Sequence, residues 1–212
     1  MDVSNNVILI VGAMAQVFFA GRSITQWWVS EKAGEIMSPT WFWGFSLIGS
    51  IFFFVYGVLR LDLAIVLGQF LNFYIYCRNL YFKGAWDAFP KVIRLFILFI
   101  PFFILGYLFM YYPDAFKTVF VNKDIGLGLL ILGMLGYLLF TFRFIYQWFI
   151  SEKLQQSKLP VGFFVISIIG SLMILVYGAF RKDIILLIGY TGGMTLYIRN
   201  LMINYSKPIR KS

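Results

Sequence analysis

Residues 22–32 read RSITQWWVSEK, and residues 143–153 read RFIYQWFISEK. Both segments contain Arg, Gln, Trp and a final Ser-Glu-Lys in the same positions. When the alignment is extended without a gap to residues 22–80 and 143–201, 23 of 59 positions are identical. Generic hydrophobicity does not place charged and polar residues in register over this length, so the chain contains an internal duplication.

The other matches are polar residues, prolines and small residues. They pair Pro39 with Pro160, Ser46 and Ser50 with Ser167 and Ser171, Tyr56 with Tyr177, Tyr76 with Tyr197, and Arg78-Asn79 with Arg199-Asn200.

The composition predicts an all-α integral membrane protein. Hydrophobic residues make up 61% of the 212 residues and charged residues only 13%, whereas soluble domains carry about 25% charged residues. The apolar residues form runs of about 20, the length that crosses a bilayer as helix. Such runs lie near 7–29, 40–59, 62–82, 92–112, 125–150, 161–180 and 183–204.

The positions of lysine and arginine predict the orientation. The net charge is +9, but the charges lie in short segments between apolar runs, which argues against nucleic acid as a partner. Most of these residues fall on the side of Lys32, Lys83 and Lys153, which the positive-inside rule makes cytoplasmic. The N-terminus is then outside and the C-terminus is cytoplasmic.

The duplication and the runs together predict a 3+1+3 organisation of seven transmembrane helices. Residues 1–90 form the first three-helix repeat, 91–124 a linker helix and outer loop, and 125–212 the second repeat. An odd number of helices per unit would invert the second copy, and the linker helix restores its orientation. Parallel repeats of this kind place a transporter's substrate site between two halves.

Polar residues in the first and third helices of each repeat are the candidate substrate-binding residues. Arg22, Gln26 and Ser30 have i, i+4 spacing and so lie on one helix face. An arginine at membrane depth usually faces a cavity or the interior of a bundle, and its planar fork suits phosphate or carboxylate. The predicted set is Arg22, Gln26, Arg78, Asn79, Arg143, Gln147, Arg199 and Asn200.

Structural roles are the alternative for these residues. Arg78 and Arg199 could reach the membrane interface by snorkelling, and Arg22 and Arg143 could pair with Glu31 and Glu152. The segments Ser30-Glu31-Lys32 and Ser151-Glu152-Lys153 are either helix ends that set topology or a gate or headgroup contact. Tyr56, Tyr76, Tyr177 and Tyr197 are predicted to line a cavity, and the small residues around Gly49 and Gly170 to support close helix packing.

The absence of histidine and the single cysteine, Cys77, remove the commonest general base and metal ligands. Aspartate and glutamate are also scarce. The sequence therefore predicts no enzyme activity, no metal and no cofactor.

The string Arg-x-x-x-Gln-Trp-x-x-Ser-Glu-Lys, followed by Pro, Ser-x-Ile-Gly-Ser, Tyr-Gly, Arg-x-Asp and Tyr-x-Arg-Asn-Leu, resembles the lipid A biosynthesis N-terminal domain family. It occurs twice here. That family is similar to the SWEET, semi-SWEET and PQ-loop transporters, which implies the same three-helix unit.

The resemblance implies a flippase that moves a polyprenyl-phosphate-linked monosaccharide, such as an undecaprenyl-phosphate sugar, across the bacterial inner membrane for lipid A or glycan modification. Membrane lipid and membrane glycosyltransferases are the implied partners. Two alternatives stay open: a SWEET-like uniporter for a free sugar, and a non-catalytic membrane subunit of a lipid A or glycan glycosyltransferase.

Overall fold

The computed structural model describes residues 5–60, 63–111, 127–182 and 184–206, and it confirms the all-α class. Within these ranges there are seven α-helices and no strand. The helices are α1 (Asn5–Ala33), α2 (Thr40–Leu59), α3 (Leu63–Phe82), α4 (Lys91–Tyr111), α6 (Leu127–Leu154), α7 (Val161–Arg181) and α8 (Ile184–Tyr205), with a short 3-10 helix η1 (Trp86–Ala88) before α4.

The helix ends follow local chemistry. Pro39 and Pro160 precede α2 and α7 in extended conformation, where a missing backbone N–H breaks no helical hydrogen bond. α1 and α6 continue through Ser-Glu-Lys to Ala33 and Leu154, about one turn beyond the predicted ends. The predicted outer loop and the aspartates of the two Arg-x-Asp motifs, at positions 62 and 183, lie outside the described residues.

Helices within each repeat pack closely because small residues lie at the contacts. A Cβ added to Gly49 of α2 would lie 2.8 Å from the Phe19 ring of α1, and one added to Gly136 of α6 would lie 2.8 Å from Ile174 of α7. Glycine at these positions lets the helix backbones approach, as in many helix pairs in membranes.

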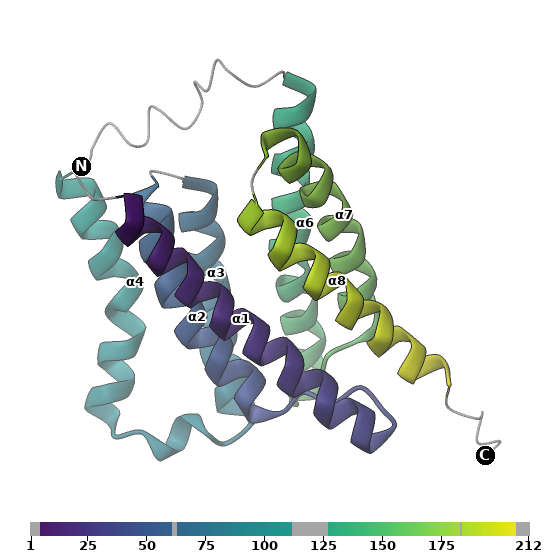
Figure 1. Ribbon diagram of the computed structural model, residues 1–212. Coiled ribbons are helices and arrows are strands. Elements are labelled where there is room, and N and C mark those ends of the chain that lie inside the picture. Colours follow the sequence, from purple (N-terminus) through teal and green to yellow (C-terminus); the bar gives the residue numbers. More distant parts are fainter. Residues whose placement is uncertain (1–4, 61–62, 112–126, 183, 207–212) are drawn as a thin grey trace.

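The two three-helix groups meet through two helix pairs. α1 contacts α8, and α3 contacts α6, so each repeat contributes its first and third helix to the interface. Figure 1 shows the groups side by side, with α4 on the outer side of the first group, where it packs against α2 and α3. The site between the repeats is therefore built from α1, α3, α6 and α8.

The distribution of polarity supports association with a membrane. Four of the described helices (α1, α2, α4 and α7) are long and apolar enough to span one. Large apolar side chains are exposed all along α4, including Val92, Phe96 and Met110, whereas Arg22, Asn79, Arg143 and several serines are buried. Soluble proteins seldom expose so continuous an apolar surface.

Candidate functional site

Arg22 and Arg143 lie at equivalent positions and have equivalent surroundings. Arg22 Nη1 donates hydrogen bonds to Ser46 Oγ at 3.3 Å and Tyr76 Oη at 3.2 Å. Arg143 Nη1 donates to Ser167 Oγ and Tyr197 Oη, both at 2.9 Å. The side chains are 6% and 1% exposed, so both charges are removed from solvent.

Aromatic rings take the place of counter-charges around these arginines. The Arg143 guanidinium lies 3.5 Å from the centre of the Phe140 ring, and the Arg22 guanidinium 4.5 Å from that of Phe19. Phe144 lies within 5.3 Å of both. No carboxylate in the described ranges forms an ion pair with either arginine. Ring faces stabilise a cation only modestly, so the site retains an excess of positive charge.

A cavity of about 740 Å³ lies between the repeats, with both arginines in its wall. It is lined mainly by residues of α1, α3, α6 and α8, among them Gln16, Gln69, Asn72, Tyr76, Tyr190 and Tyr197, with Phe53 of α2 and Ser171 of α7. Cavities of this volume hold drug-sized molecules.

Several buried polar atoms at this cavity have no hydrogen-bond partner. They are Gln69 Oε1, Asn72 Oδ1, Arg143 Nε and Ser171 Oγ. A buried polar group without a partner costs about 1–3 kcal/mol. All four of these residues line the same cavity, which indicates a site whose hydrogen bonds are completed by a ligand.

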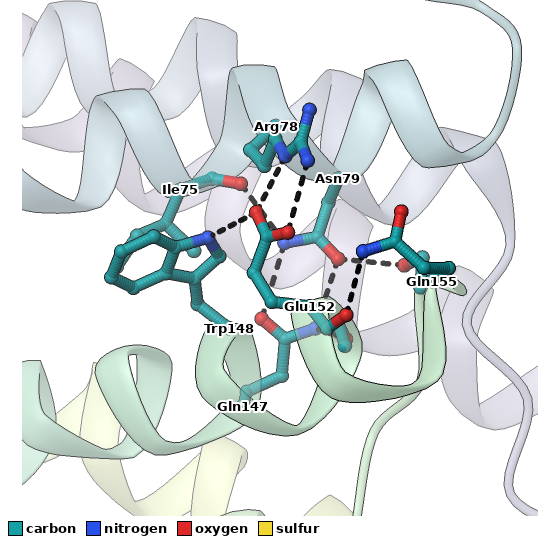
Figure 2. A network of polar contacts seen from close by, with 9 residues as sticks. Ile75, Arg78, Asn79, Gln147, Trp148, Glu152 and Gln155 are labelled. Carbon is teal, nitrogen blue, oxygen red and sulfur yellow. Dashed lines mark hydrogen bonds and ion pairs between the residues drawn. The ribbon is translucent and has the colours of Figure 1, made fainter.

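On the side of the cavity nearer the Ser-Glu-Lys segments, the two repeats are joined by reciprocal amide pairs. Asn79 and Gln147 exchange two hydrogen bonds of 3.1 and 2.9 Å, and Gln26 and Asn200 exchange two of 2.7 and 3.0 Å. All four side chains are buried. Figure 2 shows the first pair, with the two amide groups facing each other.

Two reciprocal ion pairs lie beside these amides. Arg78 donates to both oxygens of Glu152, at 2.5 and 2.9 Å, and Arg199 makes the equivalent pair with Glu31, with one bond of 2.9 Å. Arg78 and Arg199 therefore do not line the cavity, and the structure does not bring the four predicted arginines together. The alternative pairing of Arg22 with Glu31 and Arg143 with Glu152 is wrong.

The remaining predicted residues fall into two groups. Tyr76 and Tyr197 line the cavity, whereas Tyr56 packs against Phe53 and Tyr177 against Gly133. Ser30 Oγ and Ser151 Oγ accept hydrogen bonds from the glutamine one turn earlier and from the backbone N–H of residues 37 and 158. Lys32 lies over the Trp28 ring, and Lys153 is exposed.

Some cavity residues were not predicted as site residues. Ser46 and Ser167, predicted only as packing residues, bond the arginines. Gln69 and Asn72 stand where the second repeat has Tyr190 and Gly193, and this asymmetry was their only signal in the sequence. Among the described residues, no group of three His, Cys, Asp or Glu side chains could hold a metal ion.

Comparison with known proteins gives the chain a family and relatives. The model of the lipid A biosynthesis N-terminal domain matches twice, at residues 11–81 and 132–202. Lipid-A-disaccharide synthase of Chlamydia pneumoniae is 29% identical, over 93% of this chain and 33% of that protein. The protein of the same name from Chlamydia felis is 28% identical, over 95% of this chain and 34% of that protein. No solved structure matches the chain.

These relatives correct one prediction. The sequence predicted no enzyme activity, but the relatives are named as an enzyme. Scarce acidic residues and absent histidines describe only this stretch, and the chain spans about one third of the length of the curated relatives it matches. The two matches of the family model cover both three-helix repeats and confirm the duplication and the resemblance. The chain belongs to the lipid A biosynthesis N-terminal domain family.

Proposed function

We propose that this lipid A-related membrane protein binds a phosphate-containing lipid between its repeats and carries it across the bacterial inner membrane. A polyprenyl-phosphate-linked monosaccharide is the proposed substrate. One observation carries the proposal: Arg22 and Arg143 are buried in the wall of a 740 Å³ cavity, without a carboxylate partner among the described residues.

The charge of this cavity favours an anion. A single arginine at membrane depth costs about 2.5–3.5 kcal/mol on insertion scales, and two in one wall also repel each other. The phosphodiester of a polyprenyl-phosphate sugar carries one negative charge and would balance one of the two, and its oxygens fit the planar fork of a guanidinium. Arg143 Nε, which has no partner, is a free donor for one such oxygen.

The uncharged polar groups favour a hydroxyl-bearing headgroup. Gln69 and Asn72 lie three residues apart on α3, and Tyr76 follows four residues later, so the three share one helix face. This face lines the cavity from Tyr76, which bonds Arg22, to Gln69, about 10 Å further along the helix axis at 1.5 Å per residue. A phosphate at the arginines would thus place an attached sugar beside the two amides.

The proposal includes the membrane arrangement of the helices. All seven helices span the bilayer as two parallel repeats, residues 1–90 and 125–212, joined by residues 91–124, with the N-terminus outside and the C-terminus in the cytoplasm. The reciprocal pairs of Gln26 with Asn200 and Arg78 with Glu152 then close the cytoplasmic side. Transport requires these pairs to separate while the opposite ends of the repeats approach.

Reconstitution into liposomes tests the proposal. A fluorescent polyprenyl-phosphate hexose is incorporated into both leaflets, and an impermeant quencher added outside reports the fraction that becomes accessible with time. We expect wild-type protein to make nearly all of the probe accessible and the Arg22→Ala, Arg143→Ala variant to leave the inner-leaflet half protected. Arg94→Ala is the control, because Arg94 bonds Asp87 outside the cavity. Intact flipping by the double variant would refute the proposal.

A second function is favoured by the relatives. Because they are named lipid-A-disaccharide synthase and the chain spans one third of their length, the same cavity could hold a phosphorylated glycolipid for a glycosyltransferase instead of carrying it across. Under this function the wild-type protein binds the lipid with the same dependence on arginine but does not flip it. Binding without flipping in the liposome experiment would therefore select this second function. A free-sugar uniporter is disfavoured, because a neutral sugar balances neither of the two charges.

A further inference from the structure

The wall of the central cavity differs between the two repeats. Lining residues that match between the repeats include Gln16 with Tyr137, Phe19 with Phe140 and Gly68 with Gly189. On α8, however, Ile188, Gly192 and Thr195 also line the cavity. Their counterparts on α3 are Leu67, Leu71 and Tyr74, and none of these does. The cavity therefore borders a wider face of α8 than of α3.

The wider part of the cavity along α8, called the extension below, opens to the surface of the molecule between α1 and α8. Ile24 of α1 and Ile188 of α8 both line the cavity, yet they are 52% and 71% exposed. Gly192 is exposed, and a Cβ added to it would meet nothing within 4 Å. The side chain of Thr195 is also exposed, and its hydroxyl bonds the Thr191 carbonyl of its own helix. The extension is thus open and largely apolar.

On the other side, no cavity-lining residue of α3 or α6 is exposed. Leu67 and Leu71 of α3 are exposed but do not line the cavity. Tyr74, the counterpart of Thr195, donates a hydrogen bond of 2.8 Å to the Leu98 carbonyl of α4, and the Phe70 and Phe102 rings lie 5.5 Å apart edge to face. The helix contacts at the matching glycines are alike on the two sides: a Cβ added to Gly68 would lie 3.2 Å from Thr141 Oγ1 of α6, and one added to Gly189 would lie 3.0 Å from Gln16 Oε1 of α1. Among the described helices, none packs on α8 as α4 packs on α3.

We infer that the opening between α1 and α8 is a lateral portal that holds the hydrocarbon chain of the phosphate-bearing lipid. The inference rests on the proposed function. A headgroup bound at Arg22 and Arg143 inside the bundle is connected to a chain that has to stay in hydrocarbon. The chain needs a continuous apolar path from the arginines to the membrane. Ile24, Gly192 and Ile188 supply that path on one side of the molecule only.

The repeats themselves supply the variant that tests the portal. Gly192→Leu with Thr195→Tyr gives α8 the residues that α3 carries at the same positions. A Cβ at position 192 meets nothing within 4 Å, and Thr195 is exposed. Leu71→Phe, at the exposed counterpart on α3, is the matched control. Purified protein is titrated with farnesyl phosphate and, separately, with ethyl phosphate, whose chain is too short to reach the portal.

We expect the double substitution to weaken farnesyl phosphate binding at least tenfold, about 1.4 kcal/mol, and to leave ethyl phosphate binding and the melting temperature unchanged. Leu71→Phe should change neither ligand's affinity. An equal loss for both ligands, or unchanged farnesyl phosphate binding, would overturn the portal while leaving the proposed function intact. Wild-type protein that binds no farnesyl phosphate at all would overturn the proposed function and the portal with it.

Photo-crosslinking locates the chain directly. A benzophenone amino acid at Thr195 should react with radiolabelled farnesyl phosphate, and excess unlabelled farnesyl phosphate should suppress the reaction. The same group at Leu71 should give no labelling that unlabelled ligand suppresses. Equal, suppressible labelling at both positions would also overturn the portal.

Discussion

Replacing Arg143 by methionine should weaken ligand binding and leave the free energy of unfolding almost unchanged. The reason is that the cost of burying this charge and the contacts that stabilise it nearly cancel when no ligand is bound. Placing a guanidinium at membrane depth costs about 3 kcal/mol. Against this, the hydrogen bonds to Ser167 and Tyr197 contribute about 1 kcal/mol each. The contact with the Phe140 ring contributes about 1 kcal/mol more.

The sum is close to zero, so Arg143→Met should change the free energy of unfolding by less than about 1 kcal/mol. For a chain of this length that is a shift in Tm of at most about 4 °C. Methionine fills a similar volume, and Ser167 keeps its bond to the Phe163 carbonyl. Had Arg143 been held in a buried ion pair, its removal would cost about 3–5 kcal/mol.

Binding should respond very differently. Two charge-assisted hydrogen bonds to a phosphate contribute about 1.5–3 kcal/mol each, and losing both should weaken farnesyl phosphate binding about 100- to 10,000-fold. Detergent-purified protein is suited to both measurements, because its tryptophans report unfolding and titration reports affinity. Arg94→Met serves as the control. A fall in Tm of more than about 10 °C, or affinity within threefold of wild type, would refute the reasoning.

Three further predictions concern the contacts between the repeats and the polar wall of the cavity. Gln147→Leu removes the hydrogen bonds of the buried Gln147 amide with Asn79, Ser151 Oγ and the Lys158 carbonyl, which should cost about 3 kcal/mol and lower Tm by about 6–12 °C. The exposed Gln156→Leu should leave Tm unchanged, and an equal Tm for both variants would contradict the assignment. Arg78→Glu breaks the ion pair with Glu152, which is partly exposed and contributes up to about 1 kcal/mol. The labelling rate of a cysteine placed at the buried Ser157 should therefore rise about fivefold. Adding Glu152→Arg should restore slow labelling, and failure to restore it would exclude the ion pair as the cause. Asn72→Leu should weaken binding of a farnesyl-phosphate hexose about threefold to tenfold while sparing farnesyl phosphate, whereas an equal loss for both ligands would place Asn72 outside the sugar contact.

Much of the fold could be predicted from the repeat. The match between residues 22–80 and 143–201 shows which helices are equivalent, and Pro39 and Pro160 mark the start of the second helix in each copy. Burial of Arg22 and Arg143 also followed from their depth in apolar runs. These features are local in sequence, so a single chain is enough to reveal them.

The partners across the interface could not all be found in this way. Arg78 pairs with Glu152 and Asn79 with Gln147 across 74 and 68 residues of sequence, and only the packing of α3 against α6 brings them together. One error was avoidable. Glu31 lies nine residues after Arg22, which places the two on opposite faces of α1 and about 14 Å apart along its axis, too far for an ion pair.

The reciprocity of these contacts is the rule of a symmetric homodimer, in which residue i of one subunit meets residue j of the other and j meets i. Here Gln26 meets Asn200, the counterpart of Asn79, and Gln147 meets Asn79 itself. A dimer of single repeats could use the same contacts, but each of its cavity walls would have to carry identical side chains. Fusion removes that constraint. Gln69 and Asn72 can face Tyr190 and Gly193 only in a chain whose two halves are free to evolve separately.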